Sequence, residues 1–267
     1  MTTAIHRFSD STGFSASTDE LADEEPLEIQ VDTRSVAVTM RTPGHDEELA
    51  LGFLVTEGIL RHPSDVGELR PYPKNTHGNA VGVFLAPGVV MDFARLTRHV
   101  FASSSCGLCG KASIEAIRGQ FSGVGDDLFQ IAPHQLLEYP QTMHAAQNTF
   151  AATGGLHAAA LFSETGDLRV LREDVGRHNA VDKVIGHAFR QGWLPLRHQV
   201  LLVSGRASFE IQQKALAAGI SFVAAVSAPS SLAVEFARET GQSLVGFLRS
   251  GRFNVYAGPE RIHTAPI

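Results

Sequence analysis

Apolar and polar residues alternate along the chain soon after its first two dozen positions. The alternation predicts strands over residues 27–31 and 36–40, with a turn between them. A helix is predicted over residues 49–59, because its apolar residues recur at helical spacing and Gly58 stands near its end. With short strands expected near residues 80–85, this region predicts a small α+β unit over residues 25–100.

Beyond residue 140 the pattern changes to a repeated exchange of strands and helices. The strands are almost continuously apolar, which is typical of strands that are covered on both faces. We therefore predict an α/β fold, with a three-layer αβα domain over residues 126–267 built on a mostly parallel sheet. Strands are expected at 157–162, 168–171, 199–203, 220–226, 244–248 and 253–256, and helices at 143–150, 181–189, 209–218 and 232–239.

Two further segments have their own character. Residues 1–24 are polar, small and acidic, and predict a loose, flexible tail. Residues 101–125 begin with small residues around a Cys-x-x-Cys motif, and predict a mobile loop that leads into a helix.

Composition and charge narrow the classes of protein. The 267 residues are 43% hydrophobic and 19% charged, which excludes a disordered chain and a disulfide-stapled miniprotein. With 22 Lys and Arg against 28 Asp and Glu, the net charge of -6 argues against a nucleic-acid partner. No apolar run has the length of a membrane helix, and no hydrophobic segment opens the chain. We therefore expect a cytoplasmic protein without a membrane partner, in a compartment where thiols stay reduced.

The two cysteines, Cys106 and Cys109, carry the sharpest chemical signal. Two thiols three positions apart in a Ser- and Gly-rich loop can reach one another. A following helix N-terminus and the nearby Lys111 favour the thiolate, which is the form that attacks sulfur. The motif predicts thiolate chemistry at Cys106 and Cys109, and the sequence predicts no metal ligands elsewhere.

Other interpretations of the cysteine pair stay open on the residues alone. Half of a zinc knuckle would need further ligands, from histidines or a second chain, because the sequence has no second pair. A thioredoxin-like dithiol would normally follow the first strand of a βαβ unit, whereas this pair precedes the strand–helix alternation. The residues argue against a zinc deaminase, because Ala159 stands where the glutamate after His157 would be needed.

Positive charge gathers at three points of the predicted α/β domain. Arg177 and His178 open a helix after a strand, and Arg206 follows another strand. Such positions suit an anionic ligand, although a solvated helix start would look the same. A third point, residues 247–252, sets two arginines around a glycine. No P-loop or dinucleotide-binding glycine motif is present.

Taken together, four motifs resemble those of the FdhD family, the formate dehydrogenase accessory sulfurtransferases. They are SCGLCG at 105–110, TGGLHAA at 153–159, EDVGRHNAVDK at 173–183 and SGR at 204–206. The third is far more specific than any Cys-x-x-Cys. The resemblance extends from about residue 49 to residue 256.

The resemblance implies a sulfur carrier. Such a protein accepts sulfur from a cysteine desulfurase as a persulfide, here on Cys106 with Cys109 as a helper. It passes the sulfur to Mo-bis(molybdopterin guanine dinucleotide), its bound cargo, before the cofactor is inserted into formate dehydrogenase. The resemblance also implies a homodimer and a larger domain similar to the cytidine deaminase fold. Together with Arg177, His178 and Arg206, the expected cofactor-binding residues are Phe247, Leu248, Arg249, Ser250, Gly251 and Arg252.

Overall fold

The computed structural model of the chain describes residues 1–71, 79–89, 91 and 119–263. The predicted loop with Cys106 and Cys109 lies outside the described residues. Among those that are described, no helix is long and apolar enough to cross a membrane.

A four-stranded sheet carries the N-terminal part of the fold, in the order β4-β3-β6-β5. β3 and β4 form an antiparallel hairpin whose turn residues, Asp32 and Thr33, both have positive φ. Helix α1 follows and packs its apolar side on this sheet, which confirms the strands and the helix predicted for this region. The bounds are β3 Glu25–Val31, β4 Arg34–Arg41, α1 Asp46–Thr56, η1 Pro63–Asp65, β5 Val66–Pro71 and β6 Ala80–Leu85.

A six-stranded sheet forms the larger part, in the order β12-β11-β10-β9-β7-β8. Only β9, β10 and β11 run parallel, and the other neighbours pair antiparallel, so the prediction of a mostly parallel sheet is wrong. Short turns join β7 to β8 and β11 to β12, and such turns connect only antiparallel strands. The bounds are β7 His157–Phe162, β8 Leu168–Asp174, β9 Val200–Val203, β10 Phe222–Ala225, β11 Ser243–Arg249 and β12 Arg252–Ala257.

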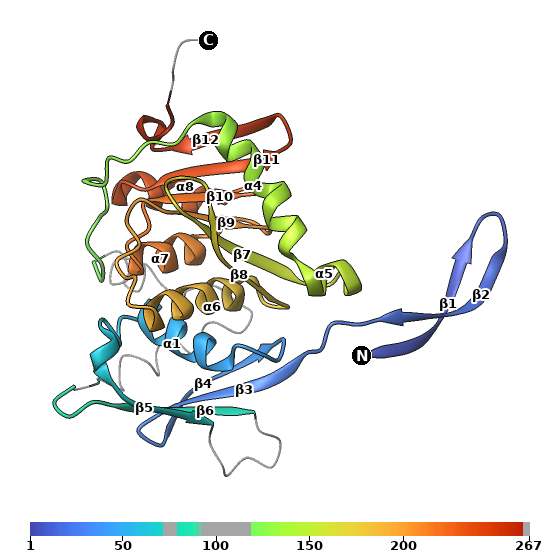
Figure 1. Cartoon of the computed structure of the whole chain (residues 1–267), viewed down its shortest axis with the longest axis horizontal. Coiled ribbons are helices and arrows are strands. Elements are labelled where there is room, and N and C mark those ends of the chain that lie inside the picture. The colour runs from blue at the N-terminus through green and yellow to red at the C-terminus, as the bar shows by residue number, and fades with distance from the viewer. Residues whose placement is uncertain (72–78, 90, 92–118, 264–267) are drawn as a thin grey trace.

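Helices cover both faces of this sheet, which confirms the three-layer arrangement (Figure 1). Ala159 and Leu161 of β7 face one core, while Ala160 and Phe162 face the other, as the two-residue period of a strand requires. One face packs on α6, α7 and α8, and the opposite face packs on α4. The helices are α4 Pro133–Ala146, α5 Asn148–Thr153, α6 Arg177–Arg190, α7 Phe209–Ala217, α8 Ser231–Thr240 and η2 Pro259–Arg261.

The two sheets are joined through a close crossing of α1 and α6. At Gly52 of α1, an added Cβ would overlap the backbone carbonyl of Asp182, and at Gly186 of α6 it would overlap that of Glu48. Glycine is therefore required for the helix backbones to come this near. As a result one hydrophobic core runs from the four-stranded sheet through α1 and α6 to the six-stranded sheet.

The N-terminal residues depart from the predicted loose tail. β1 (Thr2–Ser9) and β2 (Gly13–Glu20) pair along their whole length as an antiparallel hairpin that projects from the body (Figure 1). Phe8 and Phe14 face each other across the strands with ring centroids 5.2 Å apart, next to the turn. β-Branched and aromatic residues favour strands, and Gly13 adopts positive φ at the turn. These local preferences outweigh the polar composition on which the tail prediction rests.

Candidate functional site at the carboxyl edge of the sheet

The motifs of the larger domain meet at one edge of the six-stranded sheet. β9 ends at Val203 and is followed by Ser204, while the antiparallel β7 begins at the same edge with His157. The backbone N–H of Ala158 donates to Oγ of Ser204 over 2.9 Å, which joins the two motifs directly. In open α/β folds, ligands bind at the carboxyl ends of the parallel strands. This edge is therefore the candidate site.

His157 is half-buried at the centre of this edge. A Cβ added to Gly205 would lie 3.3 Å from Nδ1 of His157, so the glycine allows the backbone after β9 to approach the imidazole. Burial lowers the pKa of His157, and the positive charges of Arg177 and His178 lower it further. The ring is thereby kept neutral beside a cationic group. From the sequence, His157 is predicted only as a core or site-lining residue.

The start of α6 supplies the adjacent side chains. Nε2 of His178 lies 2.8 Å from Oε2 of Glu210 and 3.4 Å from Oγ of Ser208, at the start of α7. The hydrogen bond from His178 lowers the pKa of Glu210, although burial opposes the shift. His178 is therefore tied to α7. Nε of Arg177 is buried with no hydrogen-bond partner among the described residues.

The turn between β11 and β12 lies further along the same edge. β11 lies two strands from β9, about 10 Å across the sheet, and it extends three residues beyond the level of Val203 before the turn begins. Phe247 has a φ of 52° and donates its N–H to the carbonyl of Ser227. Leu248 is buried in the core, so its side chain faces away from any ligand. The other four predicted residues of this segment, Arg249, Ser250, Gly251 and Arg252, form the exposed turn.

The structure thus places the predicted cationic residues in two separate groups. Arg177 and His178 share the edge with Arg206, which is exposed after β9. Arg249 and Arg252 are opposite residues in the antiparallel register of β11 and β12, one on each side of the turn. The edge as a whole presents guanidinium groups at two points, which suits a ligand with more than one phosphate.

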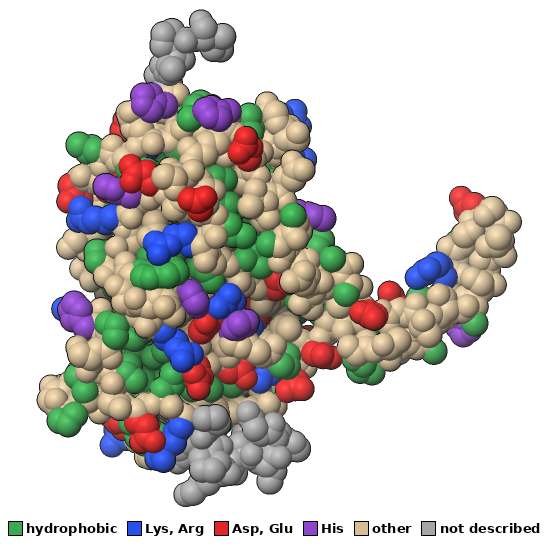
Figure 2. All heavy atoms as spheres, viewed as in Figure 1, with side chains coloured by type: hydrophobic (Ala, Val, Ile, Leu, Met, Phe, Trp, Pro, Cys, Tyr) green, Lys and Arg blue, Asp and Glu red, His purple; other side chains and the backbone are tan. Residues whose placement is uncertain are grey.

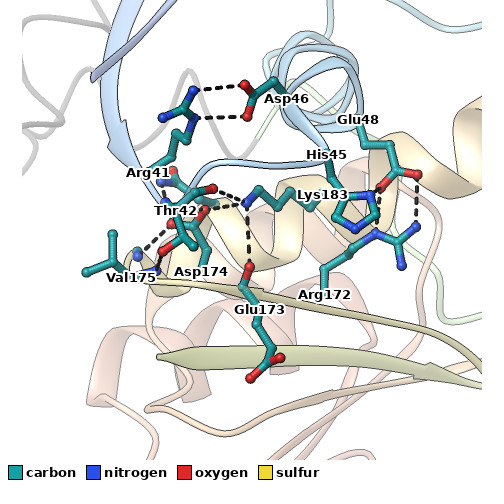
Figure 3. Close-up of polar contacts among 12 residues, drawn as sticks. Arg41, Thr42, His45, Asp46, Glu48, Arg172, Glu173, Asp174, Val175 and Lys183 are labelled. Atoms are coloured by element: carbon teal, nitrogen blue, oxygen red, sulfur yellow. Dashed lines mark hydrogen bonds and ion pairs between the residues drawn. The ribbon is translucent and has the colours of Figure 1, made fainter. Parts of the chain in front are cut away.

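Most of the EDVGRHNAVDK motif holds the fold together. Asp174, at the end of β8, lies 2.7 Å from Nζ of Lys183 on α6 (Figure 3). Its carboxylate also accepts hydrogen bonds from Asn179 and from the backbone N–H of Thr42, while Nζ of Lys183 donates to the Thr42 carbonyl. The motif therefore anchors the connection between β4 and α1. Only Arg177 and His178 remain for the site.

Two other acidic residues of this motif are also structural. Asp182 accepts hydrogen bonds from Lys214 of α7 and from Thr56 of α1, and so joins three helices. The carboxylate of Glu173 accepts from the backbone N–H groups of Thr149 and Phe150 at the start of α5. This cap begins a new helix, which explains why the single helix predicted at 143–150 is divided into α4 and α5.

A second polar cluster lies beside this motif, where α1 begins. Glu48 forms two hydrogen bonds with Arg172, of which the longer is 2.9 Å (Figure 3). Nδ1 of His187 lies 2.9 Å from the same carboxylate. Burial alone would raise the pKa of Glu48, but the hydrogen bonds from Arg172 and His187 lower it overall. Burial and the charge of Arg172 lower the pKa of His45. This cluster ties α1 to β8 and α6.

The fold and the candidate site define a class of protein: a mixed α/β domain with an arginine-bearing edge, joined through a helix pair to a smaller sheet. Within this class, the chain belongs to the FdhD/NarQ family, whose model matches residues 22–263.

Individual relatives agree. The chain is 53% identical over 252 residues to a protein of Streptomyces avermitilis named sulfur carrier protein FdhD, covering 91% of this chain and 89% of the relative. A protein of the same name from Mycobacterium tuberculosis is 52% identical over 252 residues, covering 91% of each chain. A crystal structure described as a formate dehydrogenase accessory protein, from Desulfotalea psychrophila, superposes with a TM-score of 0.78 at 23% identity. It covers 98% of this chain and 99% of that one, and its likeness shows the fold.

Proposed function

We propose that this protein is a cytoplasmic sulfur carrier that serves formate dehydrogenase. In this proposal it accepts sulfur from a cysteine desulfurase and passes it to Mo-bis(molybdopterin guanine dinucleotide) before the cofactor enters the dehydrogenase. The observation that carries the proposal is the 53% identity over nine-tenths of the chain to a relative named sulfur carrier protein. The carrier cysteines of the proposal, Cys106 and Cys109, lie within the segment that the family model matches.

The loading step needs a thiolate and a sulfur donor. The Cys106 thiolate attacks the outer sulfur of the desulfurase's cysteine persulfide. The donor's S–S bond breaks, its cysteine leaves as a thiolate, and Cys106 then carries the persulfide. Cys109 assists by attacking the inner sulfur of that persulfide, which forms a Cys106–Cys109 disulfide and releases hydrosulfide. Every electron pair is accounted for without an added oxidant.

The candidate edge supports the cargo half of the proposal. The cargo carries two diphosphates, and guanidinium groups form paired hydrogen bonds with phosphate oxygens. Arg177 and Arg206 flank the end of β9, and Arg249 and Arg252 stand two strands away. A ligand with two phosphate groups fits this spacing better than a single phosphate does. Neutral His157 adds a hydrogen-bonding group between Arg177 and Gly205 without adding charge.

Mass spectrometry of the intact chain tests the carrier step. The wild type, Cys106→Ala and Cys109→Ala would each be incubated with a cysteine desulfurase and cysteine. We expect a sulfur-sized mass gain, removed by a reducing agent, in the wild type and in Cys109→Ala but not in Cys106→Ala.

Two results would overturn the proposal. One is a wild type that gains no sulfur while metal analysis finds one zinc held by the two cysteines, as in a zinc knuckle. The other is a wild type that gains no sulfur yet turns over small disulfides, with the activity lost on replacing either cysteine, as in a dithiol-disulfide oxidoreductase.

A further inference from the structure

Glu210 is an acidic residue at an edge that otherwise gathers cationic ones. It is the second residue of α7, four positions after Arg206, and its side chain is 42% exposed. Acidic and basic side chains are interspersed on the face of the body that Figure 2 shows, so individual groups rather than a field of one sign must select a ligand. A carboxylate repels phosphate, and its place at this edge therefore indicates that it contacts a different part of the ligand.

The carboxylate of Glu210 is held in place through one of its oxygens. Nε2 of His178 lies 2.8 Å from Oε2, and the same nitrogen lies 3.4 Å from Oγ of Ser208. The hydrogen bond from His178 lowers the pKa of Glu210 in spite of its burial, so the group is ionised. Oε1 receives no hydrogen bond from the part of the chain that the structure describes. An ionised carboxylate oxygen only accepts hydrogen bonds, so a ligand group that faces Oε1 has to be an O–H or N–H donor.

Arg177 marks where a phosphate would lie beside this carboxylate. Its charge lowers the pKa values of both Glu210 and His157, so the guanidinium group lies near both residues. Its Nε is buried without a hydrogen-bond partner among the described residues, so it needs an acceptor such as a phosphate oxygen. In a nucleoside diphosphate, the ribose is bonded directly to the phosphates. A phosphate on Arg177 therefore brings the ribose, with its two hydroxyl donors, into the neighbourhood of Glu210.

We propose that Oε1 of Glu210 accepts a hydrogen bond from a ribose hydroxyl of the cargo's guanosine nucleotide, which makes Glu210 a specificity-determining residue. This inference rests on the proposed function, because it takes the candidate edge as the binding site of the cargo. Carboxylates have this role in dinucleotide-binding folds, where an acidic side chain bonds a ribose hydroxyl. His178 is then a positioning residue, because it orients the carboxylate through Oε2. A nucleotide without ribose hydroxyls would leave Oε1 unpaired against the ligand, so it should bind more weakly.

Titration calorimetry with three nucleotides tests this assignment on the full chain. The probes are GDP, 2′,3′-dideoxy-GDP, which lacks both ribose hydroxyls, and ADP, which carries a different base. We expect the wild type to bind GDP at least about tenfold more tightly than dideoxy-GDP, the value of one hydrogen bond to a charged group. In Glu210→Ala the dissociation constant for GDP should rise to that for dideoxy-GDP, which itself should stay unchanged. Glu138→Ala is the matched control, because Glu138 is exposed on α4, which packs on the opposite face of the sheet.

This pattern separates ribose recognition from two other roles for Glu210. If Glu210 only holds His178, Glu210→Ala should weaken the binding of GDP and dideoxy-GDP equally. If Glu210 contacts the base, the variant should lose its preference for GDP over ADP and keep its preference for GDP over dideoxy-GDP. Either result would overturn the inference.

The inference and the proposed function also fail in different ways. A wild type that binds GDP and dideoxy-GDP with equal affinity contradicts the inference and leaves the cargo site in place. A wild type that binds none of the three nucleotides contradicts both the inference and the cargo half of the proposed function. Sulfur loading of Cys106 is a separate measurement and decides the carrier step by itself.

Discussion

The carboxylate of Asp174 and Nζ of Lys183 lie 2.7 Å apart, with side chains that are 0% and 1% exposed. A buried ion pair is tolerated only when its remaining hydrogen-bonding positions are filled. Here Gly176 and Asn179 donate to Asp174, and Lys183 donates to the carbonyl of Thr42. The pair thereby fixes the start of α6, and with it the positions of Arg177 and His178 at the candidate edge.

Replacing Asp174 with asparagine is expected to lower the free energy of unfolding by about 3–5 kcal/mol, because Lys183 would keep a buried charge without its partner. Denaturant unfolding measures this change. The control is Arg190→Gln, which breaks an exposed ion pair with Glu47 and should change stability by no more than about 1 kcal/mol. Equal effects of the two variants would contradict the structural role of the pair.

A second prediction concerns the close crossing of α1 and α6. Gly52→Ala and Gly186→Ala should each lower the free energy of unfolding by about 1–3 kcal/mol, since the new methyl group meets backbone that cannot turn aside. Thermal unfolding followed by circular dichroism measures the effect. Gly155→Ala serves as the control, because its methyl group would meet the Ala22 side chain and the Thr153 carbonyl at ordinary van der Waals distance. A melting temperature for either helix variant equal to that of the control would show that the helices can separate freely.

The histidines predict how stability depends on pH. The pKa values of His157 and His45 are lowered from 6.5 in the folded protein, so the unfolded chain binds protons first as the pH falls. The free energy of unfolding should therefore decrease as the pH falls below about 6.5, and this loss should end below the folded pKa values. Urea titrations across this range test the sign. His157→Gln should reduce the slope, and His45→Gln added to it should reduce the slope further; an unchanged slope in the double variant would contradict the assignment.

A fourth prediction concerns nucleotide binding by the arginines at the candidate edge. Arg177→Gln and Arg206→Gln should each weaken the affinity for GDP, used as a probe of the cargo's nucleotide, by about tenfold, the loss of roughly one charge-assisted hydrogen bond. Isothermal titration calorimetry measures the dissociation constants. Arg197→Gln is the matched control, because Arg197 precedes β9 and pairs with Asp126 at the opposite edge of the sheet. If all three variants bind GDP alike, the ligand edge lies elsewhere.

Helices and strands are largely predictable, because their signals are local. The apolar spacing that predicts α6 and α8 depends on residues three or four positions apart, and Gly154 ends α5 through its own positive φ. The direction of strand pairing is not predictable in the same way. β7 looks like any buried strand in the sequence, yet it pairs antiparallel to β9, which lies almost 40 residues further along the chain.

Within the candidate site, the local sequence pattern predicts some of the residues, whereas their contacts and burial depend on tertiary packing. The SGR motif and the polar start of α6 predict Arg177, His178 and Arg206 as ligand-binding residues from their types and positions alone. The contact of His178 with Glu210 has no such signal, because Glu210 stands in an ordinary first helical turn. Leu248 is predicted as a cofactor-binding residue from its position in a motif, and only the packed core reveals that it is buried.

By itself, the sequence determined the order of elements, the family motifs and the chemistry available in their side chains. These follow from residue types and short spacings, which are present in the chain before it folds. Tertiary structure alone decided that Asp174 holds Thr42, 132 positions away, and that Asp182 holds Thr56, 126 positions away. It also decided that Phe8 and Phe14 of the N-terminal hairpin are exposed in the described part of the chain. Such roles depend on which distant surfaces meet when the core forms, and no local pattern records that choice.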